Sequence, residues 1–288
     1  MTALKNKIDF ALIFSVRNAN PNGDPLDGNR PRTTLDGKGE VSDVCLKRKI
    51  RNRLMDEGED IFVQSDDRRN DRYRSLKDRA DSVPELLELR KKKKNEEFAI
   101  AACKKWYDVR AFGQVFAIKS DKKSKGDDED AGSDALSIGV RGPVSIQSAY
   151  SVEPVSITDM QIVKSVNLET QSDPNRKARD TMGSKHRVDY GVYVTFGAIN
   201  VQCAQKTGFS DADAQKLKRA LLTLFRNDAT SARPGGSMEV LKLVWWEHNS
   251  PNGQYSSARV HRLVEVSNDG SVVVKSLEGL SCEVLDGE

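Results

Sequence analysis

The stretch Ile8-Asp-Phe-Ala-Leu-Ile-Phe-Ser-Val16 decides the fold, because its run of apolar, β-prone residues favours a strand buried within a sheet. The segment 17–32 that follows is dense in Asn, Pro and Gly, which is typical of a loop. Ser42 then predicts the N-cap of a helix that runs from Asp43 to about Glu57, and Gly58 predicts its end. The chain therefore opens with a strand, a loop and a helix.

The rest of the chain continues the alternation of strands and helices. Strands are expected once or twice in 138–166, at 188–204 and at 238–247, with weaker strands in the tail, and a helix is expected from about 209 to 227. A βα unit, further strands and then a βαβ unit together predict an α+β fold with a split-βαβ, ferredoxin-like sheet. Trp245 and Trp246 alternate across the last main strand, so one is expected in the core and the other at an interface.

Three segments interrupt this pattern. Residues 59–97 are highly charged and predict a peripheral helical insertion, and 119–134 has the composition of a charged linker. Residues 168–187 are polar and have no apolar face, so they are expected to form an extended loop or a hairpin.

Composition excludes several classes of protein. The chain of 288 residues has 46 Lys and Arg against 43 Asp and Glu, and its apolar runs are too short to span a membrane. The N-terminus carries no export signal and the four cysteines are widely scattered, which predicts a cytoplasmic protein with reduced thiols. Its three histidines lack metal-ligand spacing, so we expect neither a metal nor another cofactor.

The placement of the charges, more than their sum, suggests a polyanion as partner. In the first helix, Leu46, Ile50 and Leu54 form one apolar stripe at 100° per residue. Cations on adjacent turns flank that stripe and could follow a phosphate backbone: Lys47, Arg48 and Arg51. The alternative is an ordinary solvated helix face, and charge alone does not separate the two.

The loop 17–32 offers amide and guanidinium groups that suit phosphate and sugar contacts, namely Arg17, Asn18, Arg30 and Arg32. The same loop holds Asp24 and Asp27. These acids could bind a metal and cleave RNA, although Asp beside Pro and Gly more often forms turns.

Later segments add further candidates. In Asp108-Val-Arg-Ala-Phe-Gly113, Arg110 is interpreted as a ligand contact and Phe112 as a core residue. Met182 lies in the polar segment 168–187, where it either wedges between bases or tucks back onto the sheet. The remaining candidates are the wedge's polar neighbours Lys185, His186 and Arg187, and Arg233, which precedes two glycines that permit close approach to phosphate.

An ordered set of short motifs resembles the "Cas seven" family of the RAMP superfamily, the backbone subunit of type I CRISPR Cascade, most closely in subtype I-C. The motifs are Gly23-Asp-Pro-Leu, Asn29-Arg-Pro-Arg32, Val41-Ser-Asp-Val-Cys-Leu-Lys-Arg-Lys-Ile-Arg51, Asp108 to Gly113, Arg141-Gly-Pro-Val144, Met182-Gly183 with Tyr190-Gly191, and Thr207-Gly-Phe-Ser-Asp211. The resemblance covers residues 8 to 245, and only the motifs as a set are specific.

The resemblance implies an RRM-like palm made of residues 1–58, 98–169 and 188–288, a helical finger insertion at 59–97 and a thumb loop at 170–187. It implies a non-catalytic, antiviral subunit whose copies form a helical filament along CRISPR RNA and present the guide to target DNA. Lys47, Arg48 and Arg51 would hold the guide backbone, and Met182 would displace a guide base.

The implied partners are other copies of the chain and the end-capping RAMP, large and small Cascade subunits. Two alternatives stay open. One is a RAMP-type metal-dependent ribonuclease that cleaves guide-paired RNA with Asp24 and Asp27. The other is a monomeric RNA chaperone, which would need no filament.

Overall fold

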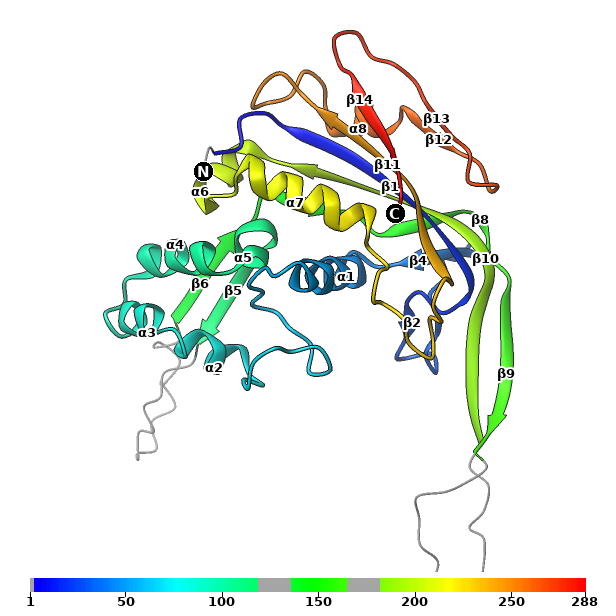
Figure 1. The fold of residues 1–288 in the computed structure, drawn as a ribbon, viewed down its shortest axis with the longest axis horizontal. Helices are drawn as coiled ribbons and strands as arrows, with labels where there is room; N and C mark the ends of the chain where they lie inside the picture. The colour runs from blue at the N-terminus through cyan, green and yellow to red at the C-terminus, as the bar shows by residue number, and fades with distance from the viewer. Residues whose placement is uncertain (1–2, 119–135, 165–181) are drawn as a thin grey trace, which may run out of the picture.

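The computed structural model describes residues 3–118, 136–164 and 182–288 and is a mixed α/β structure built on a large antiparallel sheet (Figure 1). The strands of that sheet are β1 (Ile8–Ala19), β4 (Lys38–Val41), β7 (Val144–Ile146), β8 (Ala149–Pro154), β9 (Ile157–Val163), β10 (Met182–Ile199), β11 (Met238–Glu247) and β14 (Cys282–Asp286). Their order is β14-β11-β1-β10-β8-β4, and β7 and β9 also pair with β10.

Strand β1 lies at the centre of this sheet, as its sequence predicts, and pairs with β10 on one side and β11 on the other. Its side chains alternate between two cores. Phe10, Leu12 and Phe14 face the helices, whereas Ala11 and Ile13 face the opposite side. The strand runs three residues beyond the expected end at Val16, because residues up to Ala19 still pair with β10.

The helices α1 (Asp43–Asp56), α5 (Tyr107–Phe112), α6 (Val201–Thr207) and α7 (Asp211–Leu222) contribute to the main core. The predicted start of α1 is confirmed, because the Ser42 hydroxyl accepts a hydrogen bond from the backbone N–H of Cys45 at 3.3 Å. Its stripe of Leu46, Ile50 and Leu54 is fully buried, as expected. Helix α7 begins with a capping box formed by Ser210 and Asp213.

A second core lies in the lobe at the lower left of Figure 1. Its elements are α2 (Leu76–Asp81), α3 (Pro84–Lys91), α4 (Asn95–Lys105), β5 (Gly113–Ile118) and β6 (Leu136–Arg141). Phe62, Phe98, Trp106 and Phe116 pack together there, so the lobe draws apolar side chains from both sides of position 97.

The C-terminal segment covers the other face of the sheet with α8 (Ser257–His261), β12 (Val264–Val266) and β13 (Val272–Val274). Trp245 points into the helix-covered core and Trp246 into this third core, and each is 1% exposed. The expectation that one of them lies at an interface is therefore wrong, because the tail covers the second face.

Residues 157–163 and 182–188 form the arms of a long hairpin, β9 and β10, that extends past the body of the sheet (Figure 1). Four strands, rather than one or two, occupy 136–163. Residues 182–187 are strand because each pairs with a residue of β9, from Met182 opposite Val163 to Arg187 opposite Thr158. The remaining part of the expected thumb loop, 170–181, and the expected linker 119–134 lie outside the described residues.

Short strands β2 (Gly23–Asp24) and β3 (Arg30–Pro31) fold the loop after β1 into a small ribbon. None of the helices in the three described ranges combines the length and apolar character that crossing a membrane requires.

Candidate nucleic-acid interface

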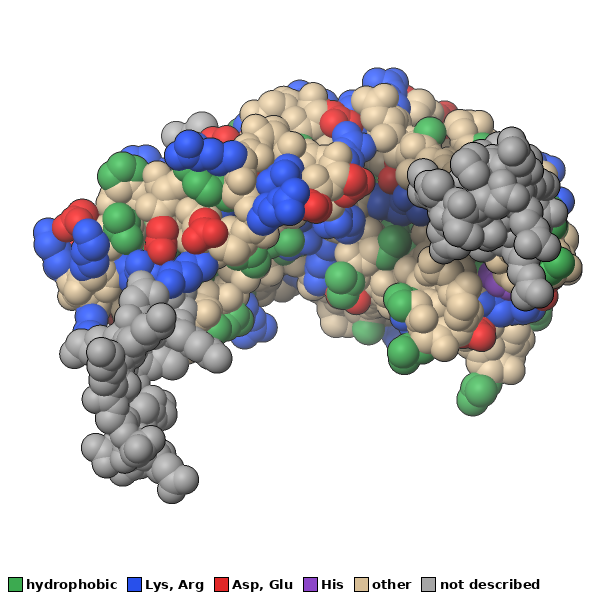
Figure 2. All heavy atoms as spheres, turned by 90° about the horizontal axis from the view of Figure 1, so that it is seen from below, with side chains coloured by type: hydrophobic (Ala, Val, Ile, Leu, Met, Phe, Trp, Pro, Cys, Tyr) green, Lys and Arg blue, Asp and Glu red, His purple; other side chains and the backbone are tan. Residues whose placement is uncertain are grey.

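The predicted contact residues in 17–51 lie on or next to α1 and the β2–β3 ribbon, on the lower side of the molecule in Figure 1. The β9–β10 hairpin and the segment before α2 extend to the same side. Figure 2 views the molecule from there and shows Lys and Arg side chains interleaved with Asp and Glu. The availability of each predicted cation to an external ligand therefore depends on the acids next to it.

Arg51 is a structural residue. Its Nε donates to Asp108 Oδ2 at 2.9 Å, and its guanidinium lies 5.1 Å from the centre of the half-buried Phe112 ring. Asp108 is 1% exposed and also accepts the backbone N–H groups of Phe62 at 2.7 Å and Val63 at 3.0 Å. Arg51 lies beside the apolar stripe as expected, but its charge compensates a buried carboxylate that joins α1, α5 and the start of the insertion. Its contact with a phosphate backbone stays a prediction.

Lys47 and Arg48 differ from Arg51 in that neither is paired with a buried acid. Lys47 forms an i,i+4 ion pair with Asp43 at 3.1 Å on the helix surface, which solvent weakens. Arg48 is half-buried and makes no hydrogen bond or ion pair to any residue that the structure describes; its charge acts on Asp67 from a distance. Of the three helix cations, Arg48 is the most available for an external phosphate.

Lys49 is a buried cation that the sequence reasoning missed. It pairs with Asp228, which also accepts from Arg233 Nε at 3.0 Å. Burial lowers the pKa of Lys49, and the adjacent Asp228 opposes that effect. Arg233 was expected to meet phosphate beside its glycines, but its guanidinium is held by Asp228 and links the loop before β11 to α1.

Arg110 is likewise internal. Its Nη2 and Nε donate to Asp213 Oδ1 at 2.8 and 3.2 Å, and Glu59 lies 3.6 Å away. Burial raises the pKa of Asp213, but hydrogen bonds from Arg110 and Ser210 outweigh it and leave that pKa lowered. The interpretation of Arg110 as a ligand contact is not supported by this geometry, since the guanidinium compensates a carboxylate that caps α7.

The first candidates of the loop lie at the end of β1, not in irregular structure. Arg17 is exposed, and its guanidinium stacks 4.7 Å from the ring centre of Tyr190 on β10. Asn18 is exposed with φ of 53°, a left-handed conformation that asparagine tolerates. Both side chains remain accessible to a ligand.

The acids of this loop serve its turns and cations. Asp24 Oδ1 accepts the backbone N–H of Leu26 at 3.1 Å and faces Arg32 Nη2 at 3.3 Å. Asp27 donates its N–H to the carbonyl of Asp24 at 3.1 Å. Within the described ranges, no three His, Cys, Asp or Glu side chains gather closely enough to hold a metal ion.

Arg30 and His186 meet at one carboxylate, which the sequence did not reveal. Asp159 on β9 accepts from Arg30 Nη1 at 2.6 Å, and its other oxygen is 2.6 Å from His186 Nδ1. The hydrogen bonds from His186 and then Arg30 lower the pKa of Asp159. This contact ties the β2–β3 ribbon to the hairpin, so both candidates have a local structural partner.

The hairpin presents an exposed Met182, at 66%, near the described end of β10. Its sulfur accepts a hydrogen bond from Gln161 Nε2 on the facing strand at 3.2 Å, and its large exposed fraction shows that the side chain is not packed into a core. Lys185 is half-buried, and Arg187 lies 3.7 Å from Asp189 while its buried Nε has no hydrogen-bond partner among the described atoms.

A family model for CRISPR-associated protein Cas7 matches residues 6–284. The chain belongs to this family. A CRISPR-associated protein Cas7 from Haloferax volcanii is 27% identical, over 99% of this chain and 82% of the relative.

Two solved structures are also similar. A chain of a CRISPR RNA-guided surveillance complex, pre-nicking, is 16% identical with a TM-score of 0.47, over 83% of this chain and 75% of that chain. A chain of a CRISPR RNA-guided surveillance complex is 15% identical with a TM-score of 0.46, over 92% of this chain and 77% of that chain.

Proposed function

We propose that the protein is a non-catalytic CRISPR RNA-binding subunit that assembles in several copies along a guide and forms the backbone of a type I-C Cascade complex. The observation that carries this proposal is the match to the Cas7 family over residues 6–284. The guide would then be presented for pairing with target DNA. The antiviral role, the cytoplasmic location and the further partners, which are the end-capping RAMP, large and small subunits, follow from the same proposal.

The sheet order supports an RRM-like palm. Strands β11, β1, β10 and β8 lie side by side, and the connections from β1 to β8 and from β10 to β11 contain α1 and α7. Numbered in chain order, β1, β8, β10 and β11 are strands 1 to 4. Their order across the sheet is then 4-1-3-2, which is the order of a split βαβ fold. We propose 59–97 as the finger insertion and 170–187 as the thumb, and the exposure of Met182 at the outer described end of the hairpin supports the latter.

The ion pairs of the candidate residues divide them into two roles. We propose that direct contact with the guide is made by residues without an ion pair in the described part of the chain, together with Lys47, whose only pair lies on the helix surface: Arg17, Asn18, Lys47, Arg48, Met182 and Lys185. Those paired with other carboxylates, which we propose to shape the surface, are Arg30, Arg32, Arg51, Arg110, His186, Arg187 and Arg233. Electrostatic attraction to phosphate should dominate binding.

Measuring RNA binding at several salt concentrations tests this function. We expect unrelated single-stranded RNAs of equal length to bind alike, and binding to weaken steeply with salt. A strong preference for one base sequence that salt does not change would contradict the proposal. Cleavage of guide-paired RNA in Mg²⁺ that Asp24→Ala abolishes would instead favour the ribonuclease.

A further inference from the structure

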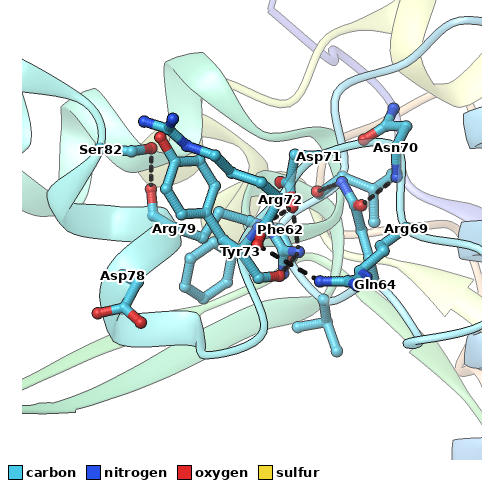
Figure 3. Close-up of polar contacts among 12 residues, drawn as sticks. Phe62, Gln64, Arg69, Asn70, Asp71, Arg72, Tyr73, Asp78, Arg79 and Ser82 are labelled. Carbon is cyan, nitrogen blue, oxygen red and sulfur yellow. Dashed lines mark hydrogen bonds and ion pairs between the residues drawn. The ribbon is translucent and has the colours of Figure 1, made fainter.

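The segment between Phe62 and α2 has little regular structure, but a buried arginine fixes it (Figure 3). Arg79 is 4% exposed, and its donors are matched by acceptors on three sides. Nε and Nη2 donate to the two oxygens of Asp71 at 2.6 and 2.9 Å, Nη1 donates to the carbonyl of Phe62 at 2.8 Å, and Nη2 also donates to the carbonyl of Tyr73 at 2.9 Å. A buried guanidinium is tolerated only when it is paired in this way.

The same network fixes the backbone of Tyr73, between Arg72 and Arg74. Asp71 Oδ1 also accepts the N–H of Tyr73 at 2.9 Å, so both backbone groups of Tyr73 are held. Arg72 is exposed, and its guanidinium carbon lies 5.4 Å from the centre of the Tyr73 ring (Figure 3). The result is a fixed outward platform of a cation stacked on an aromatic ring.

Two of the acids near this platform, Asp71 and Asp66, are already engaged. Asp71 is bound to Arg79, and Asp66 lies 3.3 Å from Arg69 and 3.8 Å from Arg74. Arg74 is 76% exposed, so its contact with Asp66 is weak in water. Within the described ranges, the Arg72 guanidinium has no carboxylate partner, and its approach to Tyr73 lowers the pKa of the Tyr73 hydroxyl.

The platform is attached to the face that carries the candidate interface. Arg68 pairs with Asp56 of α1, and its Nη1 donates to the carbonyl of Asn227 at 2.8 Å. Figure 1 places the segment before α2 below α1, on the side to which the β2–β3 ribbon and the hairpin also extend. A nucleic-acid strand that runs along α1 at Arg48 could therefore continue over this segment.

We propose that Arg72, Tyr73 and Arg74 form a contact site for single-stranded nucleic acid, with a base stacked on the Arg72–Tyr73 pair and a phosphate at Arg74. Planar guanidinium and aromatic groups both stack on bases whatever the sequence. The site deepens the proposed function and rests on it. Its ligand would be the guide RNA or the DNA strand that meets it, two sources with the same chemistry.

Fluorescence anisotropy with labelled, unstructured RNA of one length tests the site. We expect Arg72→Ala and Tyr73→Ala each to weaken binding roughly fivefold to a hundredfold, as loss of one stacked base does. Tyr73→Phe keeps the ring and should stay within about twofold of the wild type. The matched control is Lys92→Ala, which removes an exposed cation at the end of α3 and should also stay within about twofold.

A second arm adds labelled single-stranded DNA, complementary to the guide, to protein already assembled on RNA. Weakening in the RNA arm assigns the site to the guide, and weakening only in the DNA arm assigns it to the second strand. Thermal melting of each variant checks that Arg72→Ala and Tyr73→Ala are folded. Wild-type affinity in both arms for folded variants would overturn the site alone, whereas a wild-type protein that binds no nucleic acid would overturn the proposed function as well.

Discussion

Replacing Arg51 with alanine should lower the stability of the fold, although the residue lies in a basic helix of the kind that contacts phosphate. Arg51 is 14% exposed and its partner Asp108 is 1% exposed, so the substitution leaves a buried carboxylate without its cation. Breaking a buried pair in this way costs about 3–5 kcal/mol. The N–H groups of Phe62 and Val63 still bind Asp108, so we expect the lower value, about 3 kcal/mol.

For a chain of 288 residues, that loss corresponds to a melting temperature about 5 °C lower. The assay is thermal unfolding followed by circular dichroism, without RNA, on Arg51→Ala and on the matched variant Arg48→Ala. Arg48 lies on the same helix and has no carboxylate partner in the described part of the chain. Its loss should change stability by no more than about 0.5 kcal/mol. An Arg51→Ala protein that melts with the wild type but binds RNA poorly would refute the assignment of Arg51 to structure.

Other outcomes follow from the same contacts. Arg48→Ala should weaken RNA binding and flatten the salt dependence of the affinity by about one unit, whereas an unchanged slope would exclude a phosphate contact. Burial raises the pKa of Asp9, but hydrogen bonds led by His248 outweigh burial and leave that pKa lowered. The ionised Asp9 therefore stabilises the fold above its unfolded pKa of 3.8, and this stabilisation is lost as the pH falls below that value. Asp9→Asn should reduce the acid sensitivity of the protein, measured by unfolding at graded pH. A Cβ at Gly197 would lie 2.1 Å from the Phe10 ring, so Gly197→Ala should destabilise by about 1–3 kcal/mol in urea unfolding, and wild-type stability would show that the ring moves freely. Met182→Gly should leave stability within about 0.5 kcal/mol but change which guide positions tolerate mismatches to target, and a flat mismatch profile in the wild type would reject the wedge.

Elements whose causes are local could be predicted from the sequence. Helix α1 follows from its Ser42 cap and its apolar stripe, and β1 follows from its apolar run. Both causes act within a few residues. The strands at 188–199 and 238–247 were predictable for the same reason, because both segments are apolar enough to be recognised alone.

The roles of the cations could not be predicted, because their partners are distant in the chain. Asp108 lies 57 residues from Arg51, Asp213 lies 103 residues from Arg110, and Asp159 lies 129 residues from Arg30. A charge pattern shows the cation but not the acid that folding brings to it.

The pairing of polar strands and the burial of the second sheet face could not be predicted for the same reason. Residues 182–187 are polar and are strand only because β9 pairs with them. One of Trp245 and Trp246 reads as an interface residue from the sequence, but the C-terminal segment covers the face of the sheet on which Trp246 lies.

The most direct test of the proposed assembly is the mass of the complex formed on RNAs of increasing length, measured by light scattering after size exclusion. If copies of the chain line up along a guide, the mass should rise in steps of one protein for each constant increment of RNA. A complex that holds one protein at every RNA length would contradict the account.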